Sequence, residues 1–150
     1  MARSILAVIA GYVVFALSLF LAFTALYLLL GADASFKPSS YEPSILWLAL
    51  TTLLGFVASV VGGYACAALA RGGRAPLALA ALVLVVGLIF AFLVPKRSEG
   101  GADAVRAGNV PNMEAMQKAI QPKWSALLNP FLGAAGVLVG GRLRRKPANG

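Results

Sequence analysis

Four long stretches without a charged side chain limit what this chain can fold into. They cover residues 5–30, 44–70, 76–94 and 124–141. A helix needs about 20 mostly apolar residues to cross a hydrocarbon core of about 30 Å. The fourth stretch is the shortest and contains Asn129 and Pro130. We predict an all-α polytopic membrane protein, an up-down bundle of four transmembrane helices that forms one membrane domain over residues 1–150.

Composition supports this class of protein and excludes several functions. Hydrophobic residues make up 60% of the chain and charged residues 12%, against about 25% charged in typical soluble domains. A soluble domain of this size could not bury so much apolar surface. The chain has no His, and Cys66 is its single cysteine. Imidazole metal sites, intrachain disulfides and cysteine-ligated clusters are therefore excluded, and we expect no cofactor.

The basic residues predict how the bundle is oriented. Four spans place both termini on one side of the membrane, and seven Lys and Arg residues fall on that side against six on the other. The residues of the first side are Arg3, Arg71, Arg74, Arg142, Arg144, Arg145 and Lys146. Most of them adjoin helix ends, so we predict that both termini are cytoplasmic. Lys96 and Arg97, directly after the third span, argue against this orientation.

Aromatic residues gather at the opposite, outer side of the predicted membrane. Trp47 and Trp124 lie just inside spans that enter from that side, and Tyr27 and Tyr41 are nearby in the sequence. Such residues often form a belt at the membrane–water interface, and we expect these four to do so.

Small residues predict where the helices meet. Membrane helices associate by close packing of small side chains. The second span has such residues four apart, and the fourth span has a G-x-x-x-G pattern: Gly55, Ser59, Gly63 and Ala67, and Gly136 and Gly140. These residues would pack against other helices of the same bundle. A homo-oligomer interface is the alternative.

The second and fourth spans also resemble each other. Residues 54–63 read LGFVASVVGG, and residues 132–141 read LGAAGVLVGG. A duplication would make the protein two similar hairpins, related by an axis along the membrane normal. A chance match between apolar segments is the alternative.

The outer loop, residues 95–123, is the longest segment outside the predicted spans. Its first part is rich in Gly, Ala and charged residues, which indicates an irregular segment. Asn112 then predicts the N-cap of a short amphipathic helix that Pro122 ends. Met113, Met116 and Ile120 would share its apolar face and are candidate partner contacts. The alternative is that this helix lies over its own bundle.

The spans offer little chemistry. Transport sites usually place Asp, Glu, His, Lys or Arg within spans, and none of the four stretches contains one of these residues. Asn129 is the candidate polar site, because Pro130 cannot donate a backbone hydrogen bond and frees a carbonyl group one turn earlier. Serine nucleophiles lack a His partner. We therefore expect no active site and no metal site.

The chain resembles small bacterial four-span inner-membrane proteins that have no assigned activity. The resemblance is carried by GYVV at residues 11–14, GGYACAALARGGRAPLALA at residues 62–80 and GGRLRRK at residues 140–146, with Trp124 at the start of the last span. It implies a four-helix fold in the bacterial inner membrane. The loop before the last span is longer than in that pattern.

Two functions are compatible with the sequence. The first is a non-catalytic accessory or scaffolding subunit of a larger membrane complex, in contact with the lipid bilayer and with other membrane subunits but not with nucleic acid. The alternative is a small transporter, flippase or channel component, which the predicted repeat and Pro130 would favour because broken helices often line transport sites.

Overall fold

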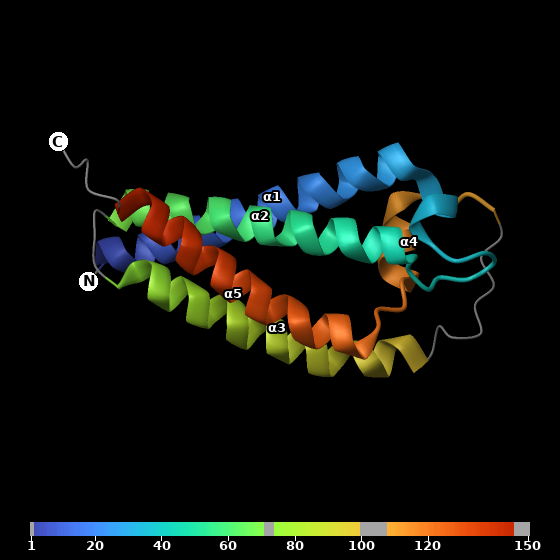
Figure 1. Cartoon of the computed structure of the whole chain (residues 1–150). Coiled ribbons are helices and arrows are strands. Elements are labelled where there is room, and N and C mark those ends of the chain that lie inside the picture. Colours follow the sequence, from blue (N-terminus) through green and yellow to red (C-terminus); the bar gives the residue numbers. More distant parts are fainter. Residues whose placement is uncertain (1, 71–73, 100–107, 146–150) are drawn as a thin grey trace.

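The fold is an all-α bundle of four long helices with one short helix at its end (Figure 1). The computed structural model describes residues 2–70, 74–99 and 108–145. The helices are α1 (Ala2–Ser35), α2 (Ile45–Ala70), α3 (Ala75–Glu99), α4 (Asn112–Lys118) and α5 (Lys123–Arg145). Helices α1, α2, α3 and α5 are long and apolar enough to cross a membrane. The predicted all-α fold class is therefore confirmed, and each of the four predicted spans coincides with one of these helices.

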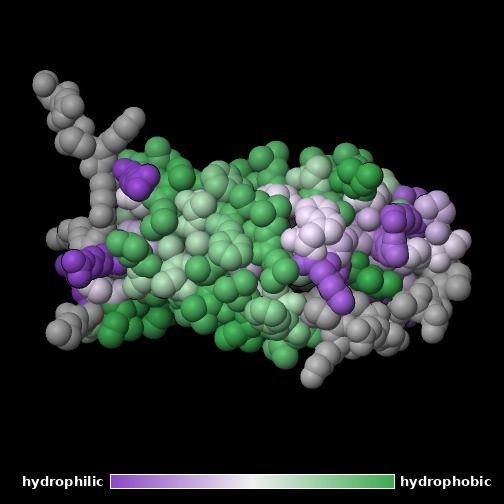
Figure 2. All heavy atoms as spheres, turned by 60° about the horizontal axis from the view of Figure 1, so that its bottom comes forward, coloured by the Kyte–Doolittle hydropathy of each residue, from purple (hydrophilic) through white to green (hydrophobic). Residues whose placement is uncertain are grey.

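The surface has the distribution of polarity that a membrane protein needs. Figure 2 shows a broad hydrophobic region over the middle of the bundle, with hydrophilic residues towards both ends. Large apolar side chains project outward along every long helix, for example Leu17, Leu53, Leu93 and Phe131. Contact with lipid explains this exposure, since a soluble surface would rarely leave so much apolar area in water.

The helices surround the bundle axis in the order α1, α2, α5, α3. Helix α5 packs against both α2 and α3, and α1 packs mainly against α2. Helices α1 and α3 begin at one end of the bundle, which we call the basic end, and α2 and α5 end there. The other end, which we call the loop end, carries α4 (Figure 1). Helices α2 and α5 are consequently parallel neighbours.

The predicted duplication would relate α1 to α3 and α2 to α5. A twofold axis along the bundle would place each helix diagonally opposite its counterpart, whereas here α1 adjoins α3 and α2 adjoins α5. Gly55 of α2 adjoins Leu19 of α1, and its counterpart Gly133 of α5 adjoins Val83 of α3. The duplication itself stays a prediction.

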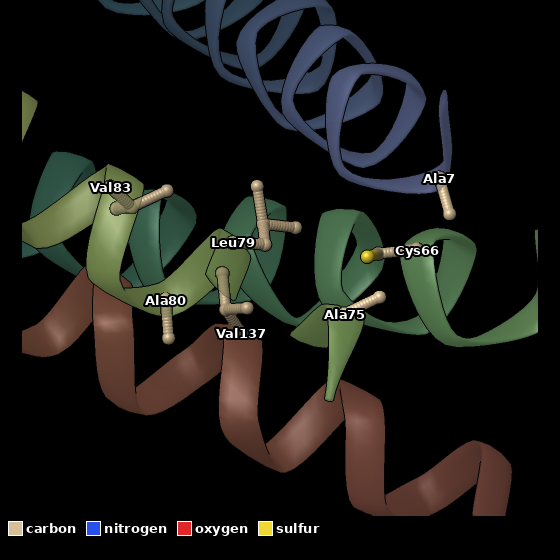
Figure 3. Close-up of a cluster of buried hydrophobic side chains, with 7 residues drawn as sticks. All are labelled: Ala7, Cys66, Ala75, Leu79, Ala80, Val83 and Val137. Carbon is tan, nitrogen blue, oxygen red and sulfur yellow. The ribbon is translucent and has the colours of Figure 1, made fainter. Parts of the chain in front are cut away.

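A cluster of buried apolar side chains lies towards the basic end, where all four long helices meet (Figure 3). The buried residues there are Ala7, Cys66, Ala75, Leu79, Ala80, Val83 and Val137. Most of these side chains are small, so the helix backbones approach closely, which is the way membrane helices associate.

Helix α1 breaks near its end, and the chain turns back over the bundle. Gly31 has a φ of 73°, which lies in the left-handed region that favours glycine. The Ser44 hydroxyl then caps α2, because its Oγ accepts a hydrogen bond from the Trp47 backbone N–H at 3.1 Å. Ser44 Oγ also donates to the Ala34 carbonyl at 2.6 Å, which ties the start of α2 to the end of α1.

The outer loop differs from its prediction in two ways. Helix α3 continues to Glu99, so the loop begins later than residue 95. The N-cap of α4 is Pro111, without a side-chain hydrogen bond, so the prediction of Asn112 at this position is wrong. Asn112 is the first helical residue, and its Nδ2 donates instead to Thr24 Oγ1 of α1 at 3.3 Å. The irregular first part of the loop lies mostly outside the described residues.

Candidate interaction site at the loop end of the bundle

A second apolar cluster lies at the loop end, and we call it the cap. Its buried residues come from α1, from the α1–α2 connection and from the segment around α4: Tyr27, Ala32, Phe36, Tyr41, Val110 and Ala115, with Trp47 and Ile120 packed against them. The cap therefore joins segments that are distant in the sequence.

Hydrogen bonds fix the outer loop to the bundle through the cap. The buried Tyr27 hydroxyl donates to the Val110 carbonyl at 2.6 Å. The Ile120 backbone N–H donates to the Tyr41 carbonyl at 3.0 Å. These two bonds hold the chain just before and just after α4, so a helix too short to be stable alone acquires a fixed position.

The aromatic belt predicted from the sequence is wrong for three of its four residues. Tyr27 and Tyr41 are only 5% and 2% exposed, and Trp47 is half-buried. Tyr27 packs edge-on against Trp47, with ring centroids 6.0 Å apart. These rings fill the cap, because the chain turns back at Gly31 and covers them. Trp124 is exposed at 60%, as a belt residue would be.

Helix α4 faces the bundle through a residue that the sequence did not single out. Ala115 is buried, whereas Met113 is 60% exposed and Met116 is 49% exposed. Ile120 lies beyond the end of α4 and packs against the cap. Helix α4 therefore lies over its own bundle on its Ala115 face and turns both methionines outward. The prediction that the methionines contact a partner stays a prediction.

Polar side chains also link α4 to the rest of the cap. Glu114 Oε1 accepts hydrogen bonds from Lys118 Nζ at 2.9 Å and from the Tyr41 hydroxyl at 3.0 Å. Lys118 Nζ also lies 5.4 Å from the centre of the Tyr41 ring. The hydrogen bonds from Lys118 and then from Tyr41 lower the pKa of Glu114, and the bond to Glu114 raises the pKa of Lys118.

We expect acid to weaken the docking of α4. The pKa of Glu114 is lower in the folded protein than its ordinary value of about 4.3, so its contribution to stability is present above that value and is lost as the pH falls through the folded pKa. The fluorescence of Trp47, recorded in a Trp124→Phe background from pH 7 to pH 3, should report this step. Glu114→Gln should remove it. Glu42→Gln, which breaks the exposed ion pair with Lys37, should leave it in place, and equal effects of the two variants would contradict the assignment.

The small residues predicted to pack helices lie mostly in the contact between α2 and α5. Ser59, Gly63, Ala67, Gly136 and Gly140 are all buried. A Cβ atom on Gly63 would meet the Val137 backbone, and one on Gly140 would meet the Val60 backbone. Gly55 lies elsewhere on α2, where a Cβ would be 3.7 Å from Leu19 of α1.

Asn129 lies on the exposed surface of α5, away from the other candidate residues. Pro130 is the buried member of this pair and packs against Gly87 of α3, where a Cβ would lie 2.8 Å from its ring. Helix α5 continues through Pro130. Two hydroxyl groups within the spans bond to their own helices: Thr51 Oγ1 donates to the Trp47 carbonyl at 2.7 Å, and Ser59 Oγ donates to the Phe56 carbonyl at 2.7 Å.

We expect Cys66 to be inert in the native protein. Its side chain is fully buried in the core near the basic end, so N-ethylmaleimide should modify it only after denaturation in SDS. Gln117→Cys on exposed α4 provides the control, since this variant should gain one adduct in native membranes and two in SDS. Modification of Cys66 in native membranes would show that the core opens.

In the described part of the chain, no group of three metal-ligating side chains comes together. The described residues of the loop end bring together apolar side chains and the Glu114–Lys118 ion pair, with Met113 and Met116 exposed on α4. The cap was missed in the sequence because Tyr27, Tyr41 and Val110 are far apart along the chain. No protein-family model matches this sequence, and neither a curated protein nor a solved structure matches it.

Proposed function

We propose that this protein is a non-catalytic accessory or scaffolding subunit of a larger membrane complex. The observation that carries the proposal is the cap, which holds α4 in a fixed position and leaves Met113 and Met116 exposed. Methionine side chains are flexible and polarisable, so they adapt well to a partner surface. Because α4 is already ordered on its own bundle, binding a partner would cost less conformational entropy.

The transport alternative receives less support from the same geometry. Its motivating features were the predicted repeat and Pro130, and Asn129 was the candidate polar site. Pro130 fills space against Gly87, and Asn129 lies on the outside of the bundle. The α2–α5 contact at Gly63 and Gly136 is too close to admit a side chain, let alone a solute. A transport site would need a polar cavity between the helices at this level.

The methionine pair provides the test of the proposal. We expect the Met113→Ser, Met116→Ser double variant to lose partners that co-purify in stoichiometric amounts with the wild-type protein from native membranes in mild detergent. The physical reason is the loss of apolar contact area at an interface, with no buried residue changed. Mass spectrometry and native gels would measure the loss.

Gln117→Ser is the matched control, because Gln117 is an exposed polar residue of the same helix. It should retain every partner. Recovery of the wild-type protein as a lone monomer or dimer, or equal partner retention by the methionine variant, would refute the proposal.

We further propose a location in the bacterial inner membrane with both termini in the cytoplasm. The location rests on the resemblance to bacterial four-span proteins, and the orientation rests on the basic residues that adjoin the helix ends. Among the described residues, Arg3 lies at the basic end, and its Nε donates to the Leu69 carbonyl of α2 at 3.3 Å. Reporter fusions active only in the cytoplasm should work at either terminus and fail when inserted after Ser39. The reverse pattern would invert the orientation.

A further inference from the structure

A hollow lies between the start of α3 and the end of α5, at the basic end of the bundle. It has a volume of about 290 Å³ and is lined by Pro76, Leu77, Leu138, Gly141 and Arg142. Four of these five residues are apolar or glycine, and Arg142 supplies the charge. Leu77 is 59% exposed, so the hollow opens onto the surface of the bundle. Its floor is the close contact of Gly141 with Pro76, where a Cβ on the glycine would lie 2.7 Å from the proline ring.

The position of this hollow determines what can reach it. It lies at the ends of two spans, where the hydrocarbon of a bilayer gives way to the headgroups. Leu77 and Leu138 offer an apolar wall to an acyl chain, and Arg142 offers a guanidinium at headgroup level. Arginine binds phosphate oxygens well, because its planar group donates several hydrogen bonds.

The charge around the hollow favours an anionic ligand. Arg74 is exposed directly before α3, and Arg142 and Arg144 are exposed near the end of α5. By sequence, the five carboxylate residues of the chain all lie in the segments assigned to the loop end, at positions 33, 42, 99, 103 and 114. The first turn of α3 also contains no acidic residue. Arg142 at the hollow therefore has no carboxylate competitor in the sequence of this end.

We infer that the hollow between α3 and α5 binds one anionic phospholipid, with an acyl chain along Leu77 and Leu138 and the phosphate at Arg142. Basic pockets between transmembrane helices are a recognised way to hold anionic headgroups. The site is independent of the exposed methionines, which lie at the opposite end of the bundle.

Native mass spectrometry of the full chain, delipidated in detergent and titrated with phosphatidylglycerol or phosphatidylcholine, tests this inference. We expect the wild-type protein to bind phosphatidylglycerol more tightly. Removing one basic group near a headgroup should cost about a fivefold loss of affinity, so Arg142→Gln should weaken phosphatidylglycerol binding by about that factor and leave phosphatidylcholine binding unchanged. Arg142→Lys should retain most of the preference.

Two matched pairs of variants distinguish binding at this site from a general attraction of anionic lipid to a basic surface. In the first pair, Lys37→Gln is the control for Arg142→Gln. Lys37→Gln removes a basic group at the loop end and should have no effect. Leu77→Trp fills the hollow without a change of charge and should lower the binding of phosphatidylglycerol, whereas Val85→Trp, at another exposed position of α3, should not. Equal affinity of the wild-type protein for the two lipids, or equal effects within either pair, would overturn the inference.

Discussion

Replacing Gly63 with alanine should destabilise the bundle by about 2–3 kcal/mol, the upper part of the range for overpacked cores. The added methyl group would meet the backbone of Val137, which cannot move aside as a flexible side chain could. Helices α2 and α5 would therefore have to separate along their shared contact. The free energy of unfolding, measured by titration with SDS in mixed micelles, should fall by this amount.

Gly55→Ala is the control for this experiment. Gly55 lies on the same helix, and its new methyl group would be an ordinary 3.7 Å from Leu19. The helix propensity of alanine exceeds that of glycine by up to about 1 kcal/mol, so this variant should be neutral or slightly more stable. If the two substitutions changed stability equally, the close contact of α2 with α5 would be refuted.

Replacing Tyr27 with alanine should release α4 from the bundle while the four long helices remain folded. Truncation of a large buried aromatic side chain costs about 3–5 kcal/mol, and this one also loses its hydrogen bond to the Val110 carbonyl. Hydrogen–deuterium exchange should show that the amides of α4 lose the protection that docking provides. The amides of α2 and α5 should exchange as in the wild-type protein.

Two further variants test what causes the release of α4 in Tyr27→Ala. Tyr27→Phe keeps the ring and removes only the hydroxyl, so it should have a smaller effect, about 1–3 kcal/mol for a buried carbonyl group left without its donor. Tyr64→Ala removes a tyrosine that is exposed on α2, and it should leave the exchange of α4 unchanged. Unchanged protection of α4 in Tyr27→Ala would show that the cap does not hold this helix.

The docking of α4 at the cap could not be predicted from the sequence. The pattern of Met113, Met116 and Ile120 left open whether this face meets a partner or its own bundle. A helix of two turns takes the orientation that its anchors impose. Here the anchors are backbone groups of Val110 and Ile120, and backbone hydrogen bonds have no signature in the sequence.

Asn129 illustrates a different limit. Its place beside Pro130 made it the candidate polar site, but the angle around α5 decides which of two adjacent residues faces inward. That angle is set by the contact of Pro130 with Gly87, a residue of another helix. The sequence alone could not establish this pairing.

The sequence by itself determined the class of protein and the four spans. Each span must by itself be an uncharged stretch long enough to cross the bilayer. This requirement can be read from each segment of the sequence separately. Tertiary structure decided the order of the helices, the parallel contact of α2 with α5 and the burial of Tyr27 and Tyr41 in the cap. These features depend on which surfaces fit together: small residues occur in every span, and only packing decides which pairs of helices approach closely enough to need them.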